Sequence, residues 1–162
     1  MSMTGRYVRV NPGVVTGILE EPTSLLDVLY PDPEPGDYVQ RYLDIDKTWH
    51  IIHFLLNGDP WECTGALGGA ILGGADVSPE DLGYGPARYL TPVEVGHIAD
   101  ALNSVSFEQL WAGYDPGRAR QAELYWSDSP TGKGCVRENY AALQSFYLRA
   151  SQQDQSVILW LA

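Results

Sequence analysis

The sequence has few cysteines and no long apolar run, and each shortage excludes a class of protein. Only Cys63 and Cys135 occur among the 162 residues, and they fit neither a CxxC motif nor the spacing of zinc ligands. No apolar run approaches the roughly 20 residues of a membrane helix. The start MSMTGRYVRV also lacks the apolar core of a signal peptide. We therefore expect a cytoplasmic protein without a membrane span, in which both thiols are reduced and buried.

Basic residues are scarce as well. The chain has 10 Lys and Arg against 21 Asp and Glu, which gives a formal net charge of −11. Residues 1–81 hold most of the excess, with 13 acidic and 4 basic residues. Such a field repels a phosphate backbone, so we expect no binding to nucleic acid. It would attract a basic protein, although a high net charge also serves solubility alone.

No complete catalytic, nucleotide or metal signature is present. The glycine-rich stretch 65–74 has neither GxGxxG spacing nor the GK[ST] ending of a phosphate loop. Its glycines are therefore expected to allow close packing against a helix, or sharp turns. GxSxG and HExxH do not occur. We accordingly assign no cofactor, no metal and no catalytic residue, and leave enzyme activity open.

The patterns that are present predict one α+β domain over residues 1–162, with a small antiparallel or mixed sheet and several helices around one central buried helix. Residues 6–10 alternate and residues 157–161 are continuously apolar, so both indicate strands, which we expect to be neighbours. Residues 88–90 suggest a short extended segment. Helices are expected at 12–20, 24–29, 44–58, 91–103, 106–114 and 136–151, and loops at 30–37, 75–86 and 127–134.

The most distinctive segment is LDIDKTWHIIHFLLNG, residues 43–58. Asp44 or Asp46 is expected to cap its helix, and Gly58 to end it. Apolar residues lie on more than one side, which favours burial of this helix. One side, at positions i, i+3, i+4 and i+7, carries Asp46, Trp49, His50 and His53.

A histidine on that side has two interpretations. It can act as a general base or bind a ligand, with an acidic residue to orient it. It can also be a hydrogen-bonded core residue beside aspartates that only cap the helix. The pair His50-x-x-His53 lacks a third ligand and is weak evidence for a metal.

The second candidate is GYGPARYL, residues 83–90. Two glycines around Tyr84, followed by a proline, shape a loop that presents Tyr84 and Arg88. Because a capped helix follows, Arg88 could help to hold an anion at that helix start. The alternative, which we favour, is a structural ion pair of Arg88 with Asp44, Asp46 or Asp76.

Through these segments the sequence resembles the YfbM-like family of small bacterial proteins, a domain of unknown function. The pattern DKxWxxxHFxLxG at 46–58 carries the resemblance, and GYGPARYLTPVEV and the closing apolar strand support it. The resemblance implies a compact α+β cytoplasmic domain without an established activity. His50 falls at a variable position of the pattern, and Asn57 departs from it. The motif positions are Asp46, Lys47, Trp49, His53 and Gly58.

These features favour a binding or interaction module, such as one that neutralises a basic toxin or effector, with the acidic loop 30–37 as an exposed edge. The alternative is an enzyme or small-molecule binder with a pocket between residues 44–58 and the loop 83–88. In that case His53, Trp49, Tyr84 and Arg88 should line one cavity. A third interpretation gives every motif residue a structural role. The candidate ligand or interaction residues are Asp46, Lys47, Trp49, His53, Tyr84 and Arg88.

Overall fold

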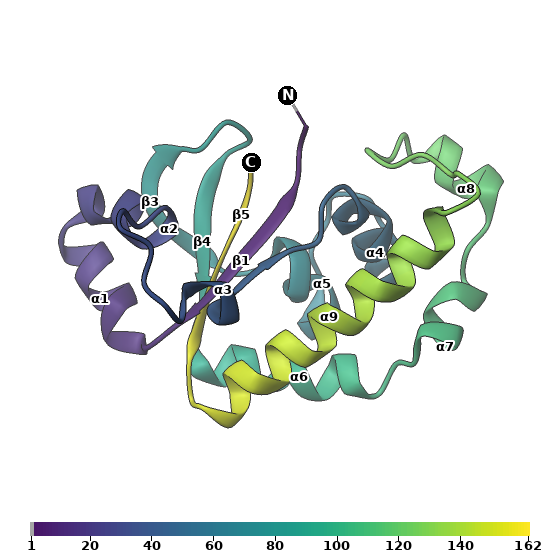
Figure 1. Cartoon of the computed structure of the whole chain (residues 1–162). Coiled ribbons are helices and arrows are strands. Elements are labelled where there is room, and N and C mark those ends of the chain that lie inside the picture. The colour runs from purple at the N-terminus through teal and green to yellow at the C-terminus, as the bar shows by residue number, and fades with distance from the viewer. Residues whose placement is uncertain (1) are drawn as a thin grey trace.

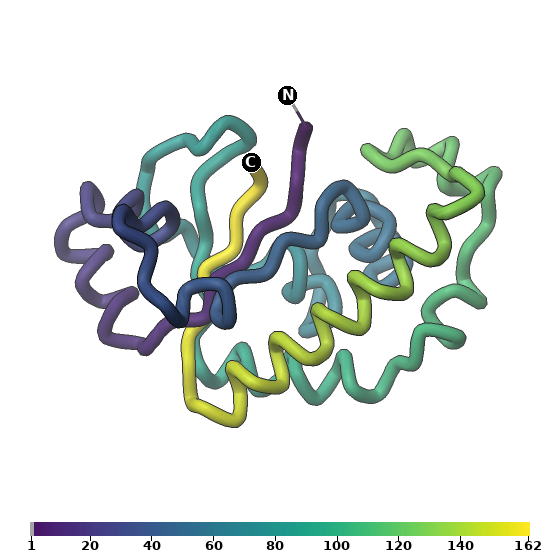
Figure 2. The backbone as a smooth tube through the Cα atoms, viewed as in Figure 1, coloured from purple at the N-terminus to yellow at the C-terminus, as the bar shows by residue number. Residues whose placement is uncertain are grey.

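The computed structural model, which describes residues 2–162, has a five-stranded antiparallel sheet at its centre with helices on both faces (Figure 1). The strands lie in the order β2-β1-β5-β4-β3. The first and last strands are neighbours, as predicted, and Figure 2 shows them side by side. The strands are β1 (Gly5–Val10), β2 (Tyr42–Asp44), β3 (Ala75–Asp81), β4 (Pro86–Leu90) and β5 (Ser156–Leu161).

Helices make up most of the rest, which confirms the α+β fold. No helix within residues 2–162 combines the length and the apolar character that a bilayer crossing needs. The helices are α1 (Pro12–Glu20), η1 (Pro22–Ser24), α2 (Leu25–Leu29), α3 (Tyr38–Arg41), α4 (Thr48–Asn57), α5 (Gly65–Leu72), α6 (Pro92–Asn103), α7 (Phe107–Ala112), α8 (Pro116–Gln121) and α9 (Gly132–Gln152).

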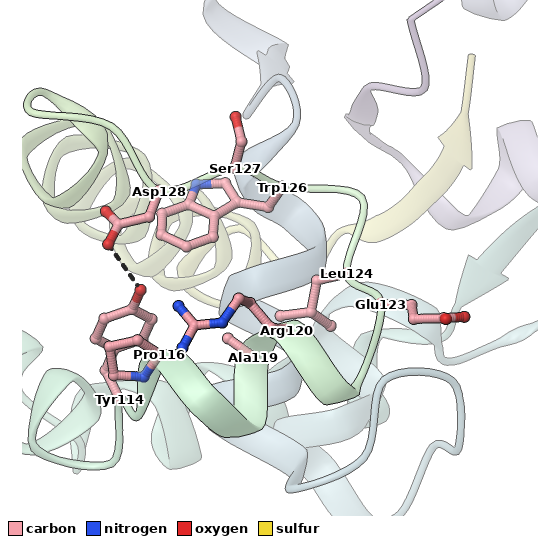
Figure 3. A pocket seen from close by; sticks show the side chains of 9 residues that line it. All are labelled: Tyr114, Pro116, Ala119, Arg120, Glu123, Leu124, Trp126, Ser127 and Asp128. Carbon is pink, nitrogen blue, oxygen red and sulfur yellow. Dashed lines mark hydrogen bonds between the residues drawn. The ribbon is translucent and has the colours of Figure 1, made fainter.

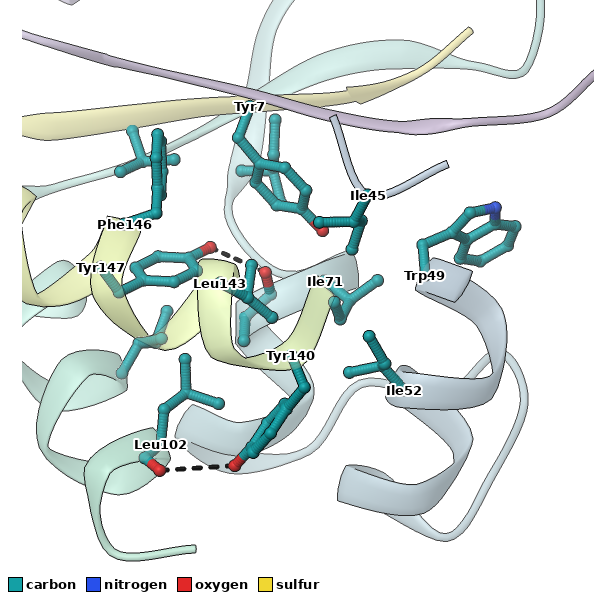
Figure 4. Packing of buried hydrophobic residues seen from close by; sticks show 14 of the residues in the cluster. Tyr7, Ile45, Trp49, Ile52, Ile71, Leu102, Tyr140, Leu143, Phe146 and Tyr147 are labelled. Atoms are coloured by element: carbon teal, nitrogen blue, oxygen red, sulfur yellow. Dashed lines mark hydrogen bonds between the residues drawn. The ribbon is translucent and has the colours of Figure 1, made fainter. Parts of the chain in front are cut away.

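Alternation along β1 divides the core in two. Because successive strand residues point to opposite faces, Tyr7 enters the larger core with α4, α6 and α9, whereas Val8 enters the smaller core with α1 and α2. In the larger core the Tyr7 ring meets Phe146 edge-on at 5.9 Å between ring centroids, close to Tyr147 (Figure 4). The whole of α4 from Thr48 to Phe54 is buried, so the prediction of a buried central helix is confirmed.

Several helix ends follow the sequence signals. Thr91 caps α6 and Ser106 caps α7, each in a reciprocal capping box. Gly58 ends α4 in the left-handed conformation, with φ of 79°. The prediction that an aspartate caps α4 is wrong. Asp44 instead accepts the backbone N–H of Asp46 at 2.7 Å, which forms a local turn, and the helix begins only at Thr48.

Two other expectations fail for physical reasons. Residues 75–81 form β3 rather than a loop. Their side chains show no strand pattern, but pairing with β4 supplies the backbone hydrogen bonds of a strand. Residues 65–72 form a helix that packs on α4 and α6, so the expectation that the glycines of this stretch allow close packing against a helix is confirmed. Cys63 and Cys135 are free but exposed, since one lies in the loop after α4 and the other in the first turn of α9.

Candidate functional site

His50 in α4 is fully buried and uses both ring nitrogens for backbone groups. Its Nδ1 accepts the N–H of Tyr125 at 2.7 Å, so the proton must sit on Nε2, which donates to the carbonyl of Pro60 at 3.0 Å. Burial lowers the pKa of His50 from 6.5 to about 4, more than the bond to Pro60 raises it. The ring is therefore a neutral structural link between α4 and two loops.

His53, one turn further along α4, is placed in the same way. Its Nε2 donates to the carbonyl of Glu62 at 2.9 Å. Its Nδ1 is buried and has no hydrogen-bond partner among the residues that the structure describes, and burial lowers the pKa of the ring. Within residues 2–162 no three His, Cys, Asp or Glu side chains are placed to hold a metal ion.

Both histidines thus hold residues 58–64, which we call the Trp61 loop. Asn57 at the end of α4 adds a third link, since its amide group donates to the Glu62 carbonyl and its Oδ1 accepts the N–H of Thr64 at 3.1 Å. Inside the loop, Asp59 accepts the N–H groups of Trp61 and Glu62, both at 2.8 Å. The polar residues of the 43–58 motif therefore give this loop a fixed backbone.

The fixed loop displays Trp61, whose side chain is 56% exposed. The indole contacts the ring of His50 in a tilted arrangement, with 4.5 Å between ring centroids. Its centroid lies 6.1 Å from that of the Trp49 ring. Trp49 itself is fully buried and donates its indole N–H to the carbonyl of Met3 at 3.1 Å. The exposed indole of Trp61 thus stands on a backbone that His50, His53 and Asp59 hold by hydrogen bonds.

Across from this loop, the turn between β3 and β4 presents Tyr84. Asp81 accepts the N–H groups of Gly83 and Gly85 at 2.7 and 3.0 Å. Both glycines have positive φ, 114° and 99°, which other residues rarely adopt. The predicted unusual loop is confirmed, and it leaves Tyr84 38% exposed.

Arg88 on β4 does not form the ion pair that the sequence suggested. Its Nη1 donates to the carbonyl of Leu72, at the end of α5, at 2.6 Å. Asp44 pairs instead with Arg6 at 3.4 Å, and no carboxylate among residues 2–162 lies within 4.0 Å of the guanidinium of Arg88. Asp76 faces Arg88 in the sheet register and attracts it only at longer range. Burial lowers the pKa of Arg88, and no atom of residues 2–162 forms a hydrogen bond with its Nε.

These parts meet in a pocket of about 280 Å³, which we call the Trp61 pocket. It contains two of the predicted residues, Tyr84 and Arg88, but the expectation that Trp49 and His53 also line it is wrong, because α4 buries both. The exposed Trp61 takes their place. The pocket is lined by Trp61, Leu72, Asp76, Tyr84, Gly85, Pro86, Arg88 and Leu161.

Asp46 and Lys47, the other two candidates, lie outside this pocket. Asp46 has φ of 48°, and its carbonyl accepts the N–H of Gly5 at 3.1 Å, which ties the start of α4 to β1. Lys47 is exposed, and its ammonium group lies 6.0 Å from the centre of the Tyr125 ring. Both therefore serve the junction of α4 with its neighbours.

A larger hollow of about 390 Å³ lies beside α8 and was not predicted from the sequence. Figure 3 shows the Arg120 side chain extending between Tyr114 and Trp126, while the hydroxyl of Tyr114 donates to Asp128 at 3.0 Å. Because its polar side chains already occupy or bridge the space, we place the candidate site at the Trp61 pocket instead.

The protein is a small α+β domain. It has a five-stranded antiparallel sheet between two helical layers, and α4 holds the Trp61 loop beside it. The chain belongs to the family described as a domain of unknown function, DUF1877, whose model matches residues 1–160. Its fold is similar to that of YfbM from Escherichia coli, a protein of unknown function, with 23% identity and a TM-score of 0.72 over 99% of this chain and 100% of that chain. No curated protein matches. The resemblance inferred from residues 46–58 is confirmed.

Proposed function

We propose that this chain is an interaction module that receives a cationic side chain of a basic partner protein in the Trp61 pocket. The observation that carries the proposal is the exposed indole of Trp61 on a loop that side chains of α4 hold in place. An aromatic side chain on a preorganised loop loses little conformational freedom on binding, so its contact area is converted efficiently into affinity.

The charges around the pocket favour a cation. Asp59 and Glu62 flank Trp61 in its loop, and Asp81 holds the turn that carries Tyr84. The single cation of the lining, Arg88, is attracted by Asp76 only at longer range and donates to a backbone carbonyl. A guanidinium or ammonium group over the indole face would gain about 0.5–2 kcal/mol from cation–π attraction. A basic toxin or effector that this chain neutralises is one partner of this kind.

The alternative is a small-molecule binder, which the hollow shape of the pocket supports. In that case a free cation such as arginine amide should bind as tightly as the same residue within a peptide. A partner protein gains further contacts with the acidic surface around the pocket, so a peptide should bind more tightly than the free residue.

The test measures binding of fluorescently labelled Arg-Gly hexapeptides by anisotropy, beside a Glu-Gly peptide and free arginine amide. We expect Trp61→Ala to weaken the Arg-Gly complex about tenfold. Leu148→Ala, which trims another exposed apolar side chain, on α9, should leave it unchanged. Tyr84→Ala provides a second variant at the opposite wall.

Two outcomes would contradict the proposal. Equal binding by Trp61→Ala and Leu148→Ala would mean that the peptide is held by diffuse charge alone. Equal binding of the Glu-Gly peptide would exclude a cation site. The indole N–H resonance of Trp61, assigned with Trp61→Phe, locates the binding directly.

A further inference from the structure

Arg9 in β1 is a buried charge that forms no ion pair with any of residues 2–162. Its side chain is only 7% exposed. The guanidinium donates to Gln153 at 2.7 Å, to Gln155 at 2.9 Å and to the carbonyl of Gln40 at 3.2 Å, and all three acceptors are neutral. Its Nε is buried and has no hydrogen-bond partner in the described part of the chain. Buried charges in proteins are ordinarily paired with an opposite charge, so this site departs from the rule.

The charged groups nearest to Arg9 do not repair the imbalance. Arg149 in the last turn of α9 and Arg41 at the end of α3 both repel it, whereas Asp37 attracts it. That carboxylate is already engaged with Arg41, at 3.0 Å. Within a chain of net charge −11, this corner is locally positive.

The corner also contains a hollow of about 280 Å³ between the α3–β2 segment and α9, which we call the Arg9 pocket. Two arginines stand in a lining that is otherwise mostly apolar and aromatic. A small pocket with apolar walls and few convergent polar groups is the usual form of a ligand site. Its lining residues are Arg9, Val39, Gln40, Tyr42, Leu43, Ala142, Ser145, Phe146 and Arg149.

We propose that the Arg9 pocket binds a small monocarboxylate with an apolar body, whose carboxylate provides the missing partner of Arg9 and Arg149. Guanidinium groups bind carboxylates through strong, charge-assisted hydrogen bonds. The rings of Tyr42 and Phe146 would contact the apolar part. A single negative charge suits the site better than a phosphate dianion, since the field of the whole chain opposes each added negative charge.

This site is separate from the Trp61 pocket and takes a ligand of the opposite charge, because the two linings share no residue. Sequence reasoning did not find it. Arg9 lies in an alternating strand where only the fold reveals that its side chain points to the α9 face with Tyr7. Arg149 belongs to the exposed side of a long helix.

The experiment titrates the full chain with 3-phenylpropionate, with the neutral 3-phenylpropan-1-ol and with inorganic phosphate, by calorimetry and by NMR of backbone amides. We expect the carboxylate to bind and to shift the amides of Gln40 and Phe146. The alcohol should bind at least tenfold more weakly, since a hydrogen bond to a charged group contributes about 1.5–3 kcal/mol. Phosphate should also bind more weakly than the carboxylate.

Arg149→Gln is the main variant, because Arg149 is exposed and its loss leaves the fold of β1 untouched. This variant should bind the carboxylate about tenfold more weakly. Arg137→Gln removes the same charge from the same helix outside the pocket and should have no effect. Equal effects of the two variants, equal binding of acid and alcohol, tighter binding of phosphate, shifts at Trp61 instead of Gln40, or no binding at millimolar concentration would each overturn the proposal.

Discussion

His50 and His53 show how single buried residues make the stability of this chain depend on pH. Burial lowers the pKa of both rings in the folded state, that of His50 from 6.5 to about 4. The unfolded chain therefore binds protons that the folded chain does not, below about pH 6.5. We expect the free energy of unfolding to fall as the pH is lowered from about 7.5 to about 5.5, with a limiting slope near 1.4 kcal/mol per pH unit for each proton.

Urea unfolding at several pH values within this window measures the effect. His50→Gln should lower the stability at neutral pH and flatten the slope, whereas His97→Gln, at an exposed position on α6, should leave the slope as it is. The carboxyl groups of Asp37, Asp59 and Asp81 have lowered pKa values and stay ionised here. The same slope in the unchanged chain, in His50→Gln and in His97→Gln would contradict a role for His50.

The candidate site was predictable only where a local signal exists. Tyr84 and Arg88 lie close in sequence to two glycines and a proline, which predict an unusual turn. Both residues line the pocket. Trp61 follows Asp59 and Pro60 in a loop with no periodicity, so its exposure is visible only in the fold. The partners of His50 are backbone groups of two separate loops, which no spacing within a helix could indicate.

Among the elements, α1 and α5 contain glycines with opposite consequences. Gly17 lies inside α1, and a Cβ there would meet nothing within 4 Å. Gly68 lies inside α5, and a Cβ there would come within 2.5 Å of the Oδ1 of Asn57, the atom that holds Thr64. We expect Gly17→Ala to stabilise the chain by about 0.5–1 kcal/mol, and Gly68→Ala to destabilise it by about 1–3 kcal/mol.

Thermal and urea unfolding of the two variants test this contrast, and each serves as the control for the other. Because Asn57 must move to admit the new methyl group, Gly68→Ala should also perturb the indole resonance of Trp61. A stabilising Gly68→Ala would show that α5 can shift away from α4 without cost. It would also refute the view that these glycines allow close packing against the central helix.

Elements with their own periodicity or caps were predicted well, and those made by pairing were not. The helix α6 starts at its capping box, and β5 is a continuous apolar run. In contrast β3 (ADVSPED) buries only Val77 and Ser78, and its proline is tolerated because β3 lies at the edge of the sheet. Short edge strands such as β2 form by pairing with strands that are distant in sequence, and no local sequence pattern predicts that pairing.

At the scale of the whole molecule, the excess of acidic residues is barely compensated by contacts. The ion pairs within residues 2–162 join Arg6 to Asp44, Arg41 to Asp37 and Arg137 to Glu108, and all are partly exposed. Most of the 21 acidic side chains therefore contribute mutual repulsion, which destabilises the compact state. This same field would attract the basic partner that we propose for the Trp61 pocket.

Salt should therefore stabilise this chain. Screening acts over about 10 Å at 0.1 M ionic strength, so we expect the Tm to rise by a few degrees between about 20 and 300 mM NaCl, as about 1 kcal/mol shifts the Tm of such a chain by roughly 2–4 °C. Removing charges from α1, from its C-cap and from α2 with Glu20→Gln, Glu21→Gln and Asp27→Asn should reduce the rise. Removing the exposed cations Arg118 and Arg120 from α8 should enlarge it. A Tm that falls with added NaCl would mean that the few ion pairs stabilise the fold more than the acidic side chains destabilise it by repulsion. In that case a basic partner would not stabilise the chain by neutralising its acidic surface.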